Sequence, residues 1–192
     1  MQKRILVINA NPDSDPARLT AALAHAYRDG AEGAGHTVHM LSLGALSFPL
    51  LRSAREFMTA PTEPDIVAAR AEFLWAEHIV FIFPLWLGSV PALLKGFMEQ
   101  VSRAQFALKE NPRGFPIGQL AGRSAHVVAT MGMPAIFYRV LFGAHGVSAF
   151  ARSILGFSGM RPVRRTYLGG AASQDSARRW LEQMRKAGQA AR

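Results

Sequence analysis

The sequence predicts an α/β fold, a doubly wound sheet of five parallel strands with helices on both faces. Three segments are rich in β-branched residues and almost continuously apolar: 4–9 (RILVIN), 77–83 (EHIVFIF) and 124–130 (SAHVVAT). Continuous hydrophobicity is typical of strands covered on both faces. The more mixed segments 36–41 and 163–168 are expected nearer the sheet edges. Helical patterns lie between the strands, and this alternation favours a parallel sheet with right-handed crossovers.

The helices are predicted from apolar residues at helical spacing and from their start signals. Asp15 is expected as an N-cap with Pro16 at the first helical position, and 62–65 (TEPD) resembles a capping box that opens a helix to about residue 75. The helical pattern repeats over 177–184, and a weaker pattern predicts a helix over 147–157. The strongest pattern runs through Val90, Leu93, Leu94, Phe97, Met98 and Val101.

Composition limits the classes of protein that this chain can belong to. Its 192 residues suit one domain, 1–192, and the absence of cysteine excludes disulfide and thiolate chemistry. The net charge is +9, but the positive residues are scattered without interleaved aromatics, so nucleic acid is not expected as a partner. No signal-like segment is apparent, and the longest apolar run, 79–88, is interrupted by Pro84. We therefore expect a soluble, cytoplasmic protein without membrane insertion.

The functional site is expected where the strands end. The sequence has no GxxxxGK[ST], GxGxxG or GxSxG motif, and its six histidines are dispersed without metal-ligand spacing, so no metal is expected. In open α/β sheets, ligands bind at the carboxyl ends of the strands, where the strand order reverses. The loops 9–18, 84–91 and 131–145 are therefore the candidates.

Each loop also has a purely structural interpretation. The helix start near Pro16 favours an anion, with Ser14, Arg18 and Thr20 as further donors, or is an ordinary turn and cap. Trp86, between two prolines, lines a pocket for a planar ring or belongs to the core or an interface. Residues 130–146 (TMGMPAIFYRVLFGAHG) form either a core segment with satisfied polar groups or one wall of a reaction site.

Four segments together carry a family resemblance: 9–23 (NANPDSDPARLTAAL), 83–101 (FPLWLGSVPALLKGFMEQV), 130–146 and 154–163 (ILGFSGMRPV). The chain resembles the flavodoxin-like NAD(P)H:quinone oxidoreductases, the quinone-reductase and modulator-of-drug-activity group. The resemblance implies a flavodoxin-like sheet of strand order 2-1-3-4-5, with FAD or FMN lying across its carboxyl edge.

The resemblance also implies roles for individual residues. Tyr138 and His145 match the catalytic pair placed near flavin N1 and O2. Asn11 stands where the family often has histidine, and the phosphate grip is expected to depend on Arg18 and backbone amides. The implied cofactor-binding residues lie in the three loops or, for Thr130, at the end of the strand before the third: Asn11, Ser14, Arg18, Pro84, Leu85, Trp86, Leu87, Thr130, Gly132 and Met133.

The implied activity is two-electron, ping-pong reduction of a quinone-like acceptor by NADPH or NADH. A homodimer is expected, with apolar residues of 43–61 either at the partner surface or folded back onto the core. Three alternatives stay open. They are an azo- or nitroreductase, an electron-carrier flavodoxin, and a regulatory subunit of a membrane transporter that docks through the basic C-terminal helix.

Overall fold

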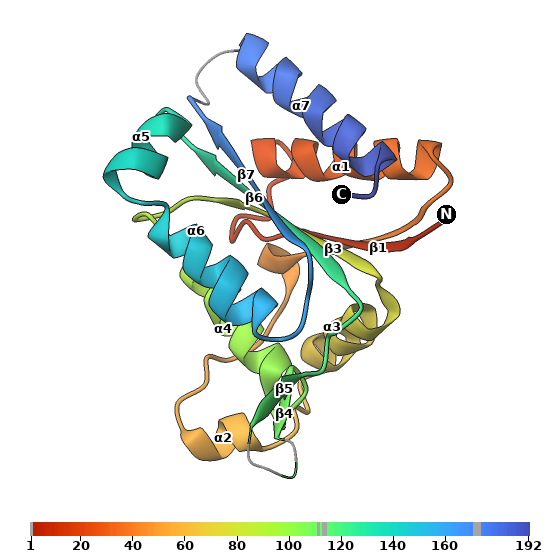
Figure 1. Cartoon of the computed structure of the whole chain (residues 1–192), viewed down its shortest axis with the longest axis vertical. Coiled ribbons are helices and arrows are strands. Elements are labelled where there is room, and N and C mark those ends of the chain that lie inside the picture. Colours follow the sequence, from red (N-terminus) through yellow and green to blue (C-terminus); the bar gives the residue numbers. More distant parts are fainter. Residues whose placement is uncertain (1, 111, 113–114, 171–173) are drawn as a thin grey trace.

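The computed structural model describes residues 2–110, 112, 115–170 and 174–192. Its main sheet has five parallel strands in the order β2-β1-β3-β6-β7, which confirms the expected order (Figure 1). Their bounds are β1 (Arg4–Asn9), β2 (Thr37–Ser42), β3 (His78–Pro84), β6 (Ser124–Met131) and β7 (Val163–Gly169).

The register brings the carboxyl ends of the strands to one edge of the sheet. Asn9 pairs with Ile82, Pro84 with Thr130, and Met131 with Gly169. The chain continues from β1 outward to β2 and then returns to add β3 on the other side of β1, so the strand order reverses between β1 and β3. The loops that follow β1, β3 and β6 therefore converge beside this switch point, as the sequence predicts.

Helices cover both faces of the sheet (Figure 1). Two helices, α1 (Leu19–Gly33) and α7 (Gln174–Gln189), pack on one face around buried residues such as Leu23 and Met184. The opposite face carries α3 (Pro64–Trp75), α4 (Ala92–Ser102), α6 (His145–Ala149) and the π-helical segment Phe150–Gly156. The short helix α5 (Ala135–Leu141) lies at the carboxyl edge, directly after β6.

The helix predicted from 62–65 to about residue 75 is confirmed by α3, but both predicted N-terminal caps are wrong. Helix α1 begins at Leu19 with Arg18 as its N-cap, because the Asp15 carboxylate instead accepts the N–H of Ala17 in a local turn. Helix α3 has Glu63 as its N-cap and no side-chain cap. The expected capping box does not form, since the Asp65 carboxylate accepts the N–H of Ser47 at 2.7 Å and holds a neighbouring loop.

The first long connection, 43–61, is tied to the end of α4. It contains a 3-10 turn (Leu43–Ala45) and helix α2 (Ala54–Met58). Buried Arg103 donates to the carbonyls of Glu56 and Thr59. Phe48 packs against Phe97 in the core, which confirms for this residue that the segment folds back onto the core. Leu50, Phe57 and Met58 are exposed, and their place at a partner surface stays a prediction.

The long connection between α4 and β6, residues 103–123, contains an antiparallel hairpin that the sequence did not predict. Its strands are β4 (Leu108–Glu110) and β5 (Pro116–Gly118).

Along the described residues, none of the helices has the length and apolar character needed to cross a bilayer.

Candidate active site at the carboxyl edge

A tight turn follows β3 and presents two apolar side chains to solvent. The N–H of Trp86 donates to the carbonyl of Ser89 at 3.1 Å, and the N–H of Ser89 donates back at 2.9 Å. The two central residues have left-handed backbones, with φ 48° at Leu87 and φ 75° at Gly88. Trp86 is half-exposed and Leu87 fully exposed. The turn therefore projects beyond the sheet with both side chains available to a ligand or partner.

Tyr138 connects this turn to the segment after β6. Its hydroxyl donates to the Gly88 carbonyl at 2.9 Å and accepts the N–H of Val147 at 3.3 Å. The residue is 1% exposed, and burial raises the pKa of its hydroxyl. A protonated, fully engaged phenol thus joins α5, α6 and the 86–89 turn.

Gly146 brings α6 into direct contact with the same turn. A Cβ at this position would lie 2.3 Å from the Gly88 carbonyl oxygen and 2.7 Å from the Ser89 Cα. His145 lies one residue earlier but is exposed, and its ring folds over Gly143, where a Cβ would lie 2.4 Å from the imidazole Nε2. Tyr138 is therefore buried in the junction of α5, α6 and the 86–89 turn, whereas the exposed side chain of His145 lies outside it.

The loop after β6 is partly open. Thr130 is buried, and its hydroxyl donates weakly to the Phe83 carbonyl at 3.4 Å. Gly132 and Met133 are exposed, and a Cβ on Gly132 would meet nothing within 4 Å. The N–H of Leu85 donates to the Thr130 carbonyl at 2.7 Å, which places this loop next to the 84–91 turn.

The first loop is organised by its own polar side chains. Asn11 is buried; its amide donates to the Thr20 hydroxyl at 3.0 Å and its carbonyl accepts the N–H of Asp13. Arg18 is not a free cation, because its guanidinium lies 2.6 Å from the Asp13 carboxylate and 3.6 Å from that of Asp15. The N–H of Asp15, with Arg18, holds the pKa of Asp13 below its usual range.

These features fit a flavin phosphate held mainly by backbone. No side chain caps the first turn of α1, and Ser14 is exposed beside it. The free N–H groups of a helix start favour an anion. A Cβ added at Gly88 or Gly132 would meet nothing within 4 Å, so neither position is covered by the chain itself. Among the described residues, no group of three His, Cys, Asp or Glu side chains is arranged to hold a metal.

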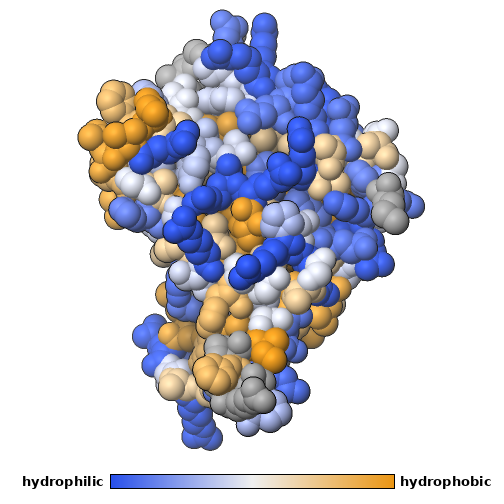
Figure 2. Space-filling view, in the orientation of Figure 1, coloured by the Kyte–Doolittle hydropathy of each residue, from blue (hydrophilic) through white to orange (hydrophobic). Residues whose placement is uncertain are grey.

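Apolar side chains form a rim beside the site. On α5 only Tyr138 is buried. Figure 2 shows hydrophobic residues gathered over α5. The exposed residues of this α5 rim are Ile136, Phe137, Val140, Leu141 and Phe142, each more than half exposed. Sequence reasoning did not identify this rim, although its apolar residues are nearly consecutive.

The residues that join the loops were also missed. A Cβ on Gly146 would lie 2.3 Å from the Gly88 carbonyl oxygen, Gly88 itself has a left-handed backbone, and Val147 supplies the second bond to Tyr138. The glycines in both loops were the available signal, but their pairing depends on a contact between segments more than fifty residues apart.

Comparisons with known proteins agree with this fold. A relative from Hahella chejuensis, named FMN-dependent NADH:quinone oxidoreductase 1, is 38% identical over 89 residues, which is 46% of this chain and 41% of the relative. That match therefore spans less than half of the relative's length. A relative from Azospirillum brasilense, named FMN-dependent NADH:quinone oxidoreductase, is 25% identical over 173 residues, or 83% of each chain.

A solved structure extends the similarity over almost the whole chain. The crystal structure of Smu.1420 from Streptococcus mutans UA159 has a TM-score of 0.79 and 25% identity, and covers 97% of this chain and 99% of that one. The family model described as flavodoxin-like fold matches residues 3–190. With the observed strand order and the converging loops, this match shows that the chain belongs to the flavodoxin-like fold family.

Proposed function

We propose that this protein is a flavin-dependent NAD(P)H:quinone oxidoreductase. The observation that carries the proposal is the junction at which Tyr138 and Gly146 meet the 86–89 turn, because it joins two of the loops expected to line a flavin. The names of the two relatives, both FMN-dependent NADH:quinone oxidoreductases, support the same activity.

FMN is the proposed cofactor, and NADH is favoured as donor by the names of those relatives. FAD and NADPH stay alternatives from the sequence. When bound, the flavin supplies the redox chemistry, accepting a hydride from the nicotinamide and passing two electrons to the acceptor. The protein supplies binding, orientation and hydrogen bonds.

The chain's own residues divide these tasks. The start of α1 would bind the phosphate through backbone N–H groups, and the 84–91 turn and Gly132 would approach the ring. Tyr138 positions the turn through Gly88. Exposed His145 is then the group best placed to donate a hydrogen bond or a proton where negative charge develops.

A homodimer is proposed because the edge site is open in one chain. Trp86, Leu87 and the α5 rim all expose apolar surface beside it. Contiguous exposed apolar surface is typical of interaction sites. A second copy that covers the rim would close the site and exclude water from it.

The test of the activity is direct. Purified protein should show flavin absorbance, release FMN on denaturation, and oxidise NADH when menadione is supplied; an azo dye in a parallel assay distinguishes the acceptor class. His145→Gln should slow hydride transfer about tenfold or more while leaving FMN affinity nearly unchanged. His25→Gln, an exposed histidine on α1, is the control. The proposal would be contradicted if the protein bound no flavin. It would also be contradicted if the protein failed to oxidise NADH with menadione and with the azo dye.

A further inference from the structure

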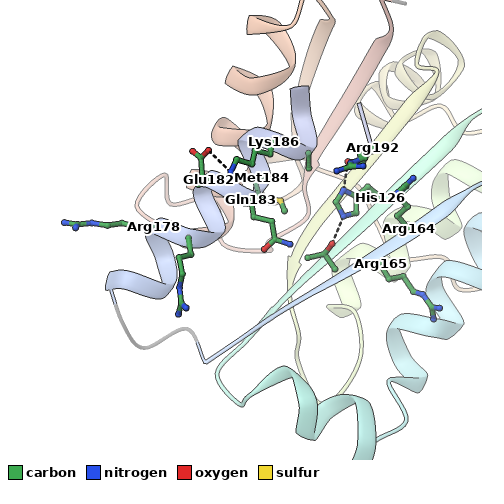
Figure 3. Close-up of a pocket in the computed structure, with 12 residues that line it drawn as sticks. His126, Arg164, Arg165, Arg178, Glu182, Gln183, Met184, Lys186 and Arg192 are labelled. Carbon is green, nitrogen blue, oxygen red and sulfur yellow. Dashed lines mark hydrogen bonds and ion pairs between the residues drawn. The ribbon is translucent and has the colours of Figure 1, made fainter. Parts of the chain in front are cut away.

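A second concave site lies away from the carboxyl edge, between β7 and α7. This β7–α7 pocket has a volume of about 960 Å³. Figure 3 shows α7 on one side, β7 on the other and His126 on the floor between them. Five cationic side chains from these two elements line it: Arg164, Arg165, Arg178, Arg179 and Lys186.

The packing of α7 explains why the pocket exists. Helix α7 lies against α1 in antiparallel contact, because Gly30 meets the backbone of Arg185 and Gly188 meets the carbonyl of Tyr27. Leu168 near the end of β7 is buried by this packing, but Arg164 near its start is exposed. The first half of the edge strand is therefore left uncovered beside the helix.

The pocket wraps around the free edge of the sheet. Consecutive strand residues point to opposite faces, yet Arg164 and Arg165 both line the pocket. β7 is the outermost strand and pairs only with β6 in the described sheet. The guanidinium of Arg165 donates to the Ser148 hydroxyl of α6 at 2.8 Å, on the other face of the sheet from α7. A ligand that wraps around this edge would thus meet guanidinium groups from both faces of β7 and from α7.

The positive charge of the pocket is mostly uncompensated. Within the described part of the chain, Arg164, Arg165, Arg178 and Arg179 have no carboxylate within ion-pair distance. Glu182, the acidic side chain in the lining, already pairs with Arg185 at 3.1 Å and Lys186 at 3.6 Å. Like charges so gathered repel one another, and a multivalent anion would relieve that repulsion.

On the pocket floor, His126 adds no charge, and Arg192 lines the pocket beside it. His126 is buried, with its Nε2 2.8 Å from the Thr166 hydroxyl and its Nδ1 3.0 Å from the main-chain oxygen of Arg192. Burial lowers the pKa of this imidazole to about 4, so the ring is neutral near pH 7. The positive charge that a ligand meets comes from the arginine and lysine side chains of the two walls and from Arg192.

We propose that the β7–α7 pocket binds a compact polyphosphate group through arginines on both walls. Guanidinium forks match phosphate oxygens in two-bond geometry, which a lysine does not provide. The volume lies within the range of about 300–1,000 Å³ found for small-ligand sites. With Arg192, five of the six cationic side chains in the lining are arginines, as phosphate recognition favours.

The lining disfavours other polyanions. His126 is the one aromatic ring among the lining residues, and both of its nitrogens are engaged, so single-stranded nucleic acid has no stacking platform there. A flat membrane surface would reach the rim of a concave pocket but not its floor. A small group that carries several phosphates meets the largest number of arginines.

The experiment is a calorimetric titration with inorganic tripolyphosphate on protein saturated with FMN. Saturation keeps the probe from the carboxyl edge, and a repeat without FMN should give the same Kd for this pocket. Two double variants remove one wall each: Arg164→Gln with Arg165→Gln, and Arg178→Gln with Arg179→Gln. We expect one site per chain in the unmodified protein, weakened about tenfold or more in each double variant.

A matched control distinguishes binding at this pocket from a general effect of the protein's net positive charge. Arg52→Gln with Arg55→Gln removes two positive charges from exposed positions just before α2 and within it, and should leave Kd unchanged. FMN binding should be equal in all three variants. Loss of polyphosphate binding can then be distinguished from a failure of the proposed flavin-dependent activity. Non-saturable binding, an equal loss in the control, or tighter binding of a single-stranded oligonucleotide than of tripolyphosphate would overturn the proposal.

Discussion

The hydroxyl of Tyr138 donates a 2.9 Å hydrogen bond to the Gly88 carbonyl, across fifty residues of sequence. The phenol has one proton, so it cannot donate to Gly88 and to a bound flavin at the same time. In this structure its task is to hold the 86–89 turn against α5 and α6. Two predictions follow from that junction.

The first prediction concerns the hydroxyl itself. Tyr138→Phe removes the bond to Gly88 and leaves the N–H of Val147 without its acceptor. We expect the free energy of unfolding to fall by about 1–3 kcal/mol, the usual effect of unpairing buried polar groups. Urea denaturation of the flavin-free protein measures it.

Tyr167→Phe is the control for this variant. The two rings are neighbours, with centroids 5.9 Å apart, but no described residue bonds the Tyr167 hydroxyl. Its removal should change stability by less than about 0.5 kcal/mol. Equal stabilities for Tyr138→Phe and Tyr167→Phe would show that the Gly88 contact does not hold the turn.

The second prediction concerns the close approach of α6. The Cβ of a Gly146→Ala variant would lie 2.3 Å from the Gly88 oxygen, a main-chain atom that moves only with its turn. We expect a loss of about 1–3 kcal/mol in unfolding free energy, together with weaker FMN binding measured by fluorescence quenching. Gly132→Ala, whose Cβ meets nothing within 4 Å, should leave the stability of the flavin-free protein unchanged.

The sequence predicted the strands well because covered parallel strands are continuously apolar, and this pattern is local. It also placed the candidate loops at the correct edge, since strand ends follow from strand positions. Helix starts were harder: Asp15 satisfies the residue preference of an N-cap, but its carboxylate folds into a local turn instead. Whether a carboxylate caps a helix or closes a local turn depends on backbone geometry, which the residue type alone does not determine.

Contacts between segments far apart in the chain could not be predicted from the sequence for a different reason. The Tyr138–Gly88 bond and the β7–α7 pocket arise where segments far apart in the chain meet, and no periodicity records that meeting. Arg18 shows the same limit, because the sequence identified the cation but not its pairing with Asp13. Its part in a phosphate site therefore stays a prediction.

The third prediction concerns strain at the tip of the β3 turn. Leu87 adopts φ 48° while fully exposed, so it bears the cost of a left-handed backbone without packing in return. Leu87→Asn creates the Asn-Gly pair preferred in such turns. We expect stability to rise by about 0.5–1 kcal/mol in thermal or urea unfolding. Leu74→Asn, an exposed leucine on α3, should give no gain.

Turnover of the Leu87→Asn variant shows whether the strained backbone at Leu87 contributes to the reaction. If Leu87 contacts the acceptor or the partner subunit, Leu87→Asn should lower turnover while it raises stability. Unchanged turnover with higher stability would show that the apolar tip has no part in the reaction. Lower stability would contradict the strain argument itself.

The fourth prediction is a loss of stability in mild acid. Burial lowers the pKa of His78 to about 3 and that of His126 to about 4, from the usual 6.5. The unfolded chain binds these protons below about pH 6.5 and the folded chain does not, so stability is complete above pH 6.5 and falls as the pH drops toward the folded values. Between pH 7.5 and 5 we expect about 2 kcal/mol from each histidine.

His126→Gln should remove about half of that pH dependence, measured by urea denaturation at pH 7.5 and pH 5. This range lies above the region in which Asp and Glu take up most of their protons. His25→Gln, at an exposed position of α1, should keep the full dependence. A full dependence in His126→Gln would mean that its imidazole is protonated in the folded protein.

The fifth prediction tests the proposed dimer through the α5 rim. Ile136 and Val140 are 60% and 70% exposed, so a charge at either position is harmless to a monomer but is buried without a partner in an interface. Ile136→Glu with Val140→Glu should convert a dimer of twice 20.9 kDa to a monomer in light scattering.

Because the rim borders the 86–89 turn, we expect NADH oxidation to fall with the loss of the dimer if the partner closes the site. The control is Val67→Glu with Leu74→Glu, which places two charges at exposed apolar positions of α3 and should leave the mass unchanged. A monomer that keeps full activity would separate assembly from catalysis. An intact dimer in the α5 variant would place the interface elsewhere, with exposed Leu50, Phe57 and Met58 as the next surface to change.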